Sequence, residues 1–531
     1  MARHPSGTAW LWISAAGLAL GPLACAGDDA SSCSCGPCQI CSSGSCQPDP
    51  ACATGGGGTG GAHQGGGGTG GTHQGGSGGS GGGPRELAPE KFIPSFVVKY
   101  CGSDGAEPAE ETAKFDLIDT DVSNDTAWAG NGLGSWRHLK ELNPDLYVVL
   151  YMIGPGEYDT SPWGHLGQGW DWMKANHGLG TADRWTARGV ASQSYLQAVS
   201  YDNERAMILG NAAWQQYWLD TLDQDWWSGG LGYDLDGADG IFADNSSYAV
   251  SWEGGWVVEG TSTPDDPEEY FANGQYLRDK WRGDMNAFFA RAVPWLRDRT
   301  RILVPNFSWM DGNPSWWLEL DSQPDPPFAA MEECGFYCSW QSWAGCELGS
   351  PCWVGHWQGM VDTMASLGHV RALMTSGAGM ERGVAGLAGM DELDPSGRTG
   401  WDALWFSLGS FMLGFDDQRG NALLGFTVWA YCEYHWLDEF DPAVLHLGLA
   451  LGPYQQQGSL FLREFEDGWI VVNPTDTAVA AAPVPSGQAR VIDHATLGSA
   501  DSEPLATSFD LGALRAAVLL KDGHLIGNQD N

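Results

Sequence analysis

The sequence predicts an α/β protein: a (β/α)₈ TIM-type barrel followed by a small antiparallel β domain. Three observations support this prediction. Short apolar, strand-like runs recur between residues 95 and 428, and helix-like segments separate most of them. Several of these runs end in polar side chains, as expected at the carboxyl ends of barrel strands. After residue 451 the pattern changes to closely spaced strands.

Eight runs are predicted to form the barrel strands, at residues 95–100, 115–122, 146–151, 240–244, 302–306, 328–333, 370–374 and 422–428. Four segments have apolar residues at helical spacing, at 212–225, 276–298, 357–367 and 401–413. A doubly wound sheet is the main alternative. The sequence lacks a glycine-rich nucleotide-binding fingerprint after the first strand, which weakens that alternative.

The β domain is predicted from a hairpin signal. Residues 460–465 and 469–473 flank Glu466, Asp467 and Gly468, and Asp-Gly between two strand-like runs is typical of a tight turn. Further runs at 490–493 and 516–520 follow.

The amino-terminal region resembles an export signal followed by a tether. An apolar run precedes Cys25, and Leu23 and Ala24 give that cysteine the surroundings of a lipidated bacterial residue, although Pro22 departs from the usual pattern. Glycine dominates from Thr54 to Pro84, as in a flexible linker. We therefore expect a signal peptide at 1–25, a cysteine-rich stub at 26–53, a linker at 54–84, the barrel at 85–451 and the β domain at 452–531.

The cysteine count fits an oxidising compartment. Of 13 cysteines, setting aside Cys25 leaves six in the stub and six in the body, and even numbers suit disulfides. Zinc binding by the stub is the alternative. The predicted localisation is extracellular or at the cell surface, through a lipid on Cys25 or as a secreted protein.

The charge limits the partners. The chain has 531 residues and a formal net charge of −40. This charge repels nucleic acid and anionic membranes, so the membrane is a predicted partner only through a lipid anchor. A carbohydrate substrate, a monomeric state and no cofactor or metal are expected.

Carboxylates at two strand ends are the central chemical signal. Asp244 ends the fourth run, and the adjacent Glu332 and Glu333 end the sixth. Side chains alternate along a strand, so only one glutamate can face the barrel axis. We prefer Glu332, with Glu333 as the alternative. A glycosidase needs a protonated carboxyl and an ionised one. Asp244 would be the nucleophile or base, and one glutamate the acid; the carboxyl separation, and hence the stereochemistry, is left open.

Other polar residues are candidates for binding sugar hydroxyls. Most of them lie at or near strand ends: Asp119, Asp121, Tyr151, Asn306 and, close to the start of its strand, Arg371. The chain also has 28 tryptophans, many in predicted loops, and these could stack on sugar rings; Trp309 is one of them. No Gly-x-Ser-x-Gly elbow follows a predicted strand, and the histidines form no zinc-binding helix motif.

These residues resemble a hypothetical TIM-barrel glycoside hydrolase family. The resemblance rests on residues 239–244, the Met-Glu-Glu run at 331–333 and residues 463–474, and it covers about residues 92–526. It implies a glycosidase with roles for Asp244 and for a glutamate at 332 or 333. Two alternatives are a non-catalytic glycan-binding barrel and a metal-dependent barrel hydrolase, such as a phosphodiesterase or deacetylase.

Overall fold

The computed structural model describes residues 39–42, 45–48, 92–100, 108–121, 136–154, 156–158, 169–199, 204–227, 237–249, 255–333, 335–337, 346–377, 387–394, 397–428, 431 and 433–527. The chain divides into the unit Leu18–Gly81 and a second unit containing the rest. In the first, β1 (Gln39–Ser42) and β2 (Ser45–Pro48) form an antiparallel hairpin. The predicted signal, Cys25 and the glycine linker lie outside the described residues.

Eight parallel strands close into a barrel, and each of the eight predicted runs overlaps one of them. Five form a sheet in the order β13-β9-β5-β4-β3, and three form a sheet in the order β14-β15-β16. Parallel bridges at Asn306–Met331 and Ser95–Leu424 join the two sheets at both edges. The strands are β3 (Phe96–Lys99), β4 (Leu117–Thr120), β5 (Tyr147–Ile153), β9 (Gly240–Asp244), β13 (Ile302–Pro305), β14 (Ala329–Glu332), β15 (Arg371–Gly377) and β16 (Ala422–Thr427).

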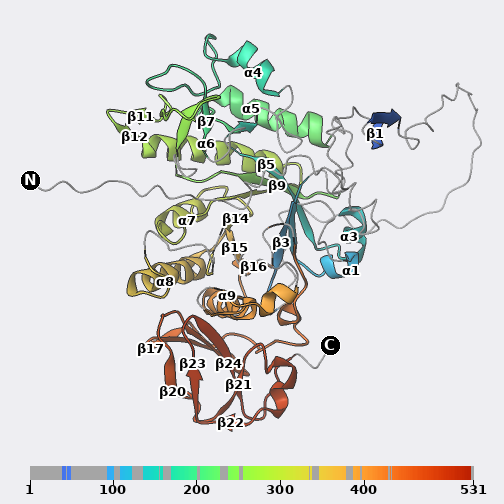
Figure 1. Cartoon of the computed structure of the whole chain (residues 1–531), viewed down its shortest axis with the longest axis vertical. Coiled ribbons are helices and arrows are strands. Elements are labelled where there is room, and N and C mark those ends of the chain that lie inside the picture. The colour runs from blue at the N-terminus through green and yellow to red at the C-terminus, as the bar shows by residue number, and fades with distance from the viewer. Residues whose placement is uncertain are drawn as a thin grey trace, which may run out of the picture. The chain divides into compact units, whose positions relative to one another are not determined.

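Helices follow most of the strands in the chain (Figure 1). They are α1 (Ala109–Thr112), α3 (Trp136–Leu142), α4 (Gly169–His177), α5 (Ala212–Thr221), α6 (Arg278–Arg297), α7 (Pro314–Asp321), α8 (Pro351–Ser366) and α9 (Gly400–Gly414). The four predicted helices are confirmed, as α5, α6, α8 and α9. Helix α5 continues as a π-helical segment, Leu222–Trp227. Helix α8 starts six residues earlier than predicted, because Ser350 caps it and Pro351 occupies its first turn.

A small antiparallel sheet is inserted around β9. Its strands are β6 (Glu157–Tyr158), β7 (Leu196–Ala198), β8 (Glu204–Arg205) and β10 (Trp256–Val258), in the order β10-β7-β8-β6. A separate two-stranded hairpin joins β11 (Phe271–Ala272) and β12 (Gln275–Tyr276). Because β6 begins four residues after β5 ends, the inserted sheet starts at the carboxyl end of the barrel.

The carboxyl-terminal strands form the predicted β domain. Strands β17 (Gln455–Gln457), β18 (Leu460–Glu464), β19 (Gly468–Asn473), β21 (Ala489–Ile492), β22 (Leu505–Ala506) and β24 (Arg515–Lys521) make one sheet, and β20 (Val479–Pro483) pairs with β23 (Ser508–Leu511). The predicted hairpin is the β18–β19 pair. One face of the six-stranded sheet contacts α9, which lies between the barrel strands and this sheet (Figure 1).

Helix α9 is buried on nearly all sides, which explains its almost continuous apolar sequence. The contact with the β domain is close: a Cβ atom added at Gly409 would lie 2.6 Å from the Cβ of Ala516 and 3.0 Å from Cγ2 of Val472. Only a glycine allows the helix backbone to approach the sheet this closely.

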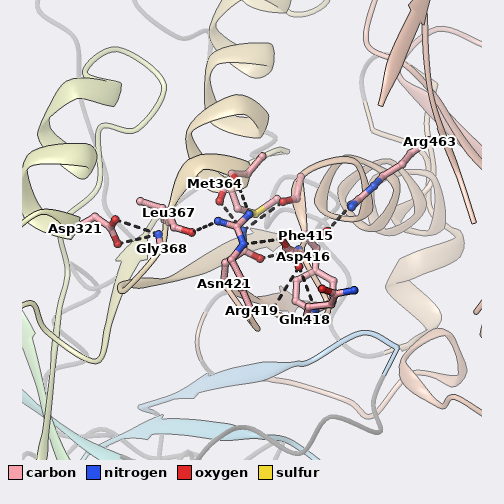
Figure 2. Close-up of polar contacts among 12 residues, drawn as sticks. Asp321, Met364, Leu367, Gly368, Phe415, Asp416, Gln418, Arg419, Asn421 and Arg463 are labelled. Atoms are coloured by element: carbon pink, nitrogen blue, oxygen red, sulfur yellow. Dashed lines mark hydrogen bonds and ion pairs between the residues drawn. The ribbon is translucent and has the colours of Figure 1, made fainter. Parts of the chain in front are cut away.

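Side chains hold the carboxyl ends of α8 and α9 (Figure 2). Arg463 on β18 donates from Nη1 to the carbonyl oxygens of Met412, at 2.8 Å, and Phe415. Arg419 donates to the carbonyl oxygens of Leu367 and Ala365 at the end of α8. These carbonyls have no partner within their own helices, and a cation is favourable at that end of a helix. Arg463 therefore ties the β domain to the barrel.

Among the described residues, we find no helix that combines the length and the apolar character required to span a membrane.

Candidate active site

Three residues from neighbouring strands meet at the carboxyl end of the barrel. Asp244 ends β9, Asn306 follows β13 directly, and Glu333 follows β14 directly. The side chains that fill the barrel interior include Phe242 and Met331. Asp244 and Glu333 lie two residues further along their strands, so they share the inward orientation.

Asp244 is buried, with 6% of its surface exposed, and it accepts three hydrogen bonds. Tyr151 donates to Oδ2 at 2.6 Å, and both Asn306 Nδ2 and the backbone N–H of Asn245 donate to Oδ1 at 2.9 Å. Burial raises the pKa of Asp244 above its usual value, whereas these three bonds lower it. Hydrogen-bond donors to both carboxyl oxygens thus stabilise the ionised form of Asp244.

Glu333 shares one of those donors. Asn306 Nδ2 donates to Glu333 Oε2 at 3.0 Å, and Tyr431 donates to Oε1 at 2.8 Å. Burial and the charge of Asp244 raise the pKa of Glu333, and the bonds from Asn306 and Tyr431 lower it. One amide group therefore bridges the two carboxyls.

The preference for Glu332 over Glu333 is wrong as to which glutamate faces the axis. Glu332 points out of the barrel, where its Oε2 accepts from the backbone N–H of Met310 at 2.8 Å. Burial and the charge of Asp311 raise its pKa well above the usual value. Met331 points into the barrel interior. Because side chains alternate along a strand, the next residue, Glu332, points to the outer face of the barrel.

A third carboxyl lies beside the pair. Asp119 on β4 is fully buried and shares its orientation with Leu117, a residue of the barrel interior. Tyr100 donates to Oδ2 of Asp119, and no described residue donates to Oδ1. Burial raises the pKa of Asp119 well above its usual value; the Tyr100 bond lowers it, and the charges of Asp244, Asp121 and Glu333 raise it further.

The other predicted residues divide into two groups. Asp121 is buried just past the end of β4, Tyr151 contacts Asp244 directly, and Trp309 is partly exposed in the segment after β13. Arg371 lies at the amino end of β15, paired with Ala329. It therefore lies at the opposite end of the barrel from Asp244, and its prediction as a binding residue is wrong.

The inserted sheet brings a further acid to the site. Glu204 on β8 is buried and accepts from Asn245 Nδ2 at 2.8 Å. Burial and the charge of Asp244 raise the pKa of Glu204 to about 8. Asn245 is itself held with a φ of 57°, in the left-handed region that costs energy for residues with a side chain.

Backbone conformations of this kind also follow β13. Ser308 has a φ of 48° and Trp309 a φ of 64°, and the Ser308 hydroxyl accepts from the backbone N–H of Glu333 at 3.3 Å. Such conformations cluster at functional sites, where the surrounding structure compensates for them. Here they occur directly after the strands that carry Asp244 and Asn306.

The sequence interpretation missed Tyr100, Tyr431, Tyr158 and Glu204. The three tyrosines lie at or shortly after strand ends, so the rule that identified Tyr151 could have found them. Tyr158 contacts the hydroxyl of Tyr151 at 3.0 Å. Glu204 has no signal in the sequence, because it comes from the inserted sheet.

Several tryptophans predicted in loops are core residues. Trp170, Trp256 and Trp317 are buried, and a core position explains them without a sugar. Trp163, Trp252, Trp340 and Trp343 lie outside the described residues.

Two cysteines of the body form a disulfide rather than a metal centre. Cys346 and Cys352 are bonded to each other, beside His356. Sulfurs in a disulfide are not thiolate ligands. Cys101, Cys334, Cys338 and Cys432 lie outside the described residues.

The fold and the site together define a barrel hydrolase with paired carboxylates, the equipment of a glycosidase. A family model described as hypothetical glycosyl hydrolase family 15 matches residues 140–469. The chain belongs to this family, and its class of activity is glycoside hydrolysis. No curated protein sequence matches the chain.

Solved structures that are similar to this chain include the following three. A family GH13_31 enzyme has 9% identity and a TM-score of 0.42, covering 81% of this chain and 99% of its own. A maltogenic α-amylase, AmyB from Thermotoga neapolitana, has 9% identity and a TM-score of 0.40, covering 82% and 99%. The trehalulose synthase MutB from Pseudomonas mesoacidophila MX-45 has 9% identity and a TM-score of 0.43, covering 81% and 98%.

Proposed function

We propose that this glycoside hydrolase works by a two-carboxylate, retaining mechanism in which Asp244 is the nucleophile and Glu333 the general acid and base. The proposed substrate is an extracellular polysaccharide or oligosaccharide. The observation that supports the mechanism best is the Asn306 amide nitrogen, which donates to both carboxyls.

The hydrogen bonds support the division of roles. Asp244 accepts three bonds, and each stabilises its ionised form. Glu333 accepts two, and the neighbouring charge of Asp244 favours its protonated form. Two carboxyls whose surroundings separate their proton affinities in this way suit a nucleophile and an acid.

The bridge also limits the distance between the carboxyls. Bonds of 2.9 and 3.0 Å to one nitrogen place Asp244 Oδ1 and Glu333 Oε2 within about 6 Å of each other at any angle. At the roughly 120° between the two N–H bonds of a planar amide, the separation is about 5 Å. Retaining glycosidases have carboxyls about 5–5.5 Å apart, and inverting enzymes about 6.5–9.5 Å.

The reaction then takes two steps. Glu333 gives its proton to the glycosidic oxygen while an Asp244 carboxylate oxygen attacks the anomeric carbon, so the bond to the leaving sugar breaks as a glycosyl ester forms. Glu333, now ionised, removes a proton from water. The resulting hydroxide displaces Asp244 and regenerates both groups, with the original anomeric configuration.

The test combines variants with product stereochemistry. Asp244→Asn and Glu333→Gln are each expected to lower kcat by at least about 10³-fold on a panel of polysaccharides. Glu332→Gln is the matched control and is expected to keep most of the activity. Proton NMR of the first product should show the anomer of the substrate.

Full activity in Asp244→Asn would remove the proposed nucleophile. An inverted first product would remove the retaining mechanism but not the carboxyl pair. Glycan binding that Asp244→Asn leaves unchanged, without cleavage of any substrate, would favour a non-catalytic binding barrel.

We further propose that the chain is exported and held at the cell surface through a lipid on Cys25. The apolar run before Leu23, Ala24 and Cys25, and the glycine-rich linker after them, support this proposal. Labelling with a fatty-acid analogue should mark the wild type and not Cys25→Ala. Equal labelling of both proteins would contradict it.

A further inference from the structure

The centre of the site contains more carboxyl groups than the proposed reaction uses. The mechanism requires Asp244 and Glu333. Asp119 is the third member of the cluster and has no part in either bond-making step. Each of the three accepts a hydrogen bond from a tyrosine: Tyr100 on Asp119, Tyr151 on Asp244 and Tyr431 on Glu333. These tyrosines pack edge to face, with ring centroids of Tyr100 and Tyr151 5.0 Å apart.

All of the donors to this cluster are neutral. They are phenol hydroxyls, the Asn306 amide and a backbone N–H. Among the described residues, no lysine or arginine forms an ion pair with Asp119, Asp244 or Glu333, and none appears among the charges that set their pKa values. Within the described part of the chain, neutral groups therefore supply the hydrogen-bond donors of the cluster, and no cation is paired with its carboxyls.

One acceptor in the cluster receives no hydrogen bond from the described residues. Asp119 is 0% exposed, and its Oδ1 has no partner among the described residues. An unsatisfied buried carboxyl oxygen costs about 1–3 kcal/mol or more, so a donor from a bound molecule would be favourable at this atom. Because Asp119 points inward with Leu117, this oxygen lies in the same interior as Asp244 and Glu333.

Acidic residues also outnumber basic ones in the segments of the sequence that come after the barrel strands. Outside the described residues, the segments that follow the barrel strands in the chain, 101–107, 122–135, 159–168, 250–254, 338–345 and 378–386, contain one basic residue, Arg382. They contain six acidic residues: Asp104, Glu107, Asp125, Asp159, Glu253 and Glu381. The whole chain has a net charge of −40, which attracts polycations and repels polyanions.

We propose that the substrate of this site is a glycan whose sugars carry a free, protonated amine, and that Asp119 is its counter-ion. This inference rests on the proposed function and names the class of sugar that the same site prefers. The ammonium group donates to Oδ1 of Asp119 and supplies the positive charge that the cluster lacks. N-acetylation of the sugar removes that charge and adds bulk, so the acetylated polymer is the poorer substrate.

The test compares matched polymers. Poly-glucosamine and poly-galactosamine are each offered beside the same material after chemical N-acetylation, together with neutral glucans. The expected kcat/KM is at least about tenfold higher for the free amine, which corresponds to about 1.4 kcal/mol. Added salt is expected to weaken binding of the amine and not of the neutral sugar.

Asp119→Asn tests the residue. This substitution keeps the size of the side chain and removes its charge. The ratio of kcat/KM for amine over acetylated polymer should fall toward one. A purely structural role would lower both values equally and would overturn the assignment of Asp119.

The outcomes separate this inference from the proposed function. Asp244-dependent cleavage of acetylated or neutral glycans as fast as of free-amine glycans would overturn the inference and leave the function standing. If no polymer is cleaved, the proposed function fails, and calorimetry with glucosamine and galactosamine oligomers and their N-acetylated forms decides the inference. Equal binding of both forms would overturn it.

Discussion

At the scale of single residues, the amide of Asn306 determines what the site can do. One planar NH₂ group has two hydrogens, and each serves a different carboxyl. The separation of Asp244 and Glu333 is thus set by the geometry of a single side chain. An aspartate at this position would have the same shape but would offer two acceptors where two donors are needed.

Two tyrosine variants are expected to move opposite limbs of the pH profile. Tyr431 stabilises ionised Glu333, so Tyr431→Phe raises the pKa of Glu333. Glu333 must be protonated to act as the acid, and the basic limb of kcat/KM therefore moves to higher pH. Tyr151 stabilises ionised Asp244, so Tyr151→Phe raises the pKa of Asp244. Asp244 must be ionised, and the acidic limb moves to higher pH.

Each variant serves as the control for the other, measured as kcat/KM against pH on one substrate. Movement of the acidic limb in Tyr431→Phe, or of the basic limb in Tyr151→Phe, would reverse the assigned roles of Asp244 and Glu333.

Glu204 is expected to act through Asn245. Its carboxyl holds the Asn245 side chain, and the backbone N–H of Asn245 donates to Asp244. Glu204→Ala should lower kcat about tenfold, or about 1.4 kcal/mol. Glycine adopts the φ of 57° without cost, so Asn245→Gly keeps the backbone bond without the side chain.

The double variant decides this point. In the Asn245→Gly background, Glu204→Ala should cost almost nothing further, since the link between the two residues is already absent. Additive losses would show that Glu204 acts on the site by another route.

At the scale of elements, sequence patterns predicted the strands, but they did not always predict which side chains of a strand point into the barrel. Each of the eight barrel strands overlaps a predicted run, because buried parallel strands are short apolar segments, although two of the strands extend further than predicted. In the sixth run, the residues before the two glutamates, Phe-Ala-Ala-Met, include no polar side chain that marks an inward or outward face. The choice between Glu332 and Glu333 depended on that face, which only the packing of Met331 revealed.

The inserted sheet shows the same limit. Its strands are two or three residues long, too short for a periodic signal. Glu204 reaches the site only because β8 pairs with β6 and β7. Tertiary pairing of this kind is not recorded in local sequence.

Two glycine substitutions test the packing of helices. Gly409→Ala places a methyl group 2.6 Å from the Cβ of Ala516 and is expected to lower the free energy of unfolding by about 1–3 kcal/mol. Gly355→Ala in α8 meets nothing within 4 Å and should raise it by about 0.5–1 kcal/mol. Urea unfolding measures both. Stabilisation by Gly409→Ala would show that α9 does not approach the β domain this closely.

At the scale of the whole molecule, the barrel and the β domain are expected to unfold together. Arg463 on β18 caps the carboxyl end of α9, a helix that also contacts β15 and β16. Arg463→Met leaves buried carbonyl oxygens without donors and should cost about 1–3 kcal/mol. Arg297→Met breaks an exposed ion pair with Asp325 and should cost less than about 1 kcal/mol.

Thermal unfolding followed by calorimetry should give one transition for the wild type and for both variants. Two separated transitions in the wild type would contradict this coupling.

The two edges at which the barrel closes have a consequence for the reaction itself. Asp244 belongs to the five-stranded sheet and Glu333 to the three-stranded one, and these sheets meet on this side at the bridge between Asn306 and Met331. The two reacting groups are therefore carried by different sheets of the barrel. If the two sheets separated beside Asn306, the distance between the carboxyls of Asp244 and Glu333 would increase. The stereochemical fidelity of the enzyme therefore depends on how firmly the two sheets are joined there.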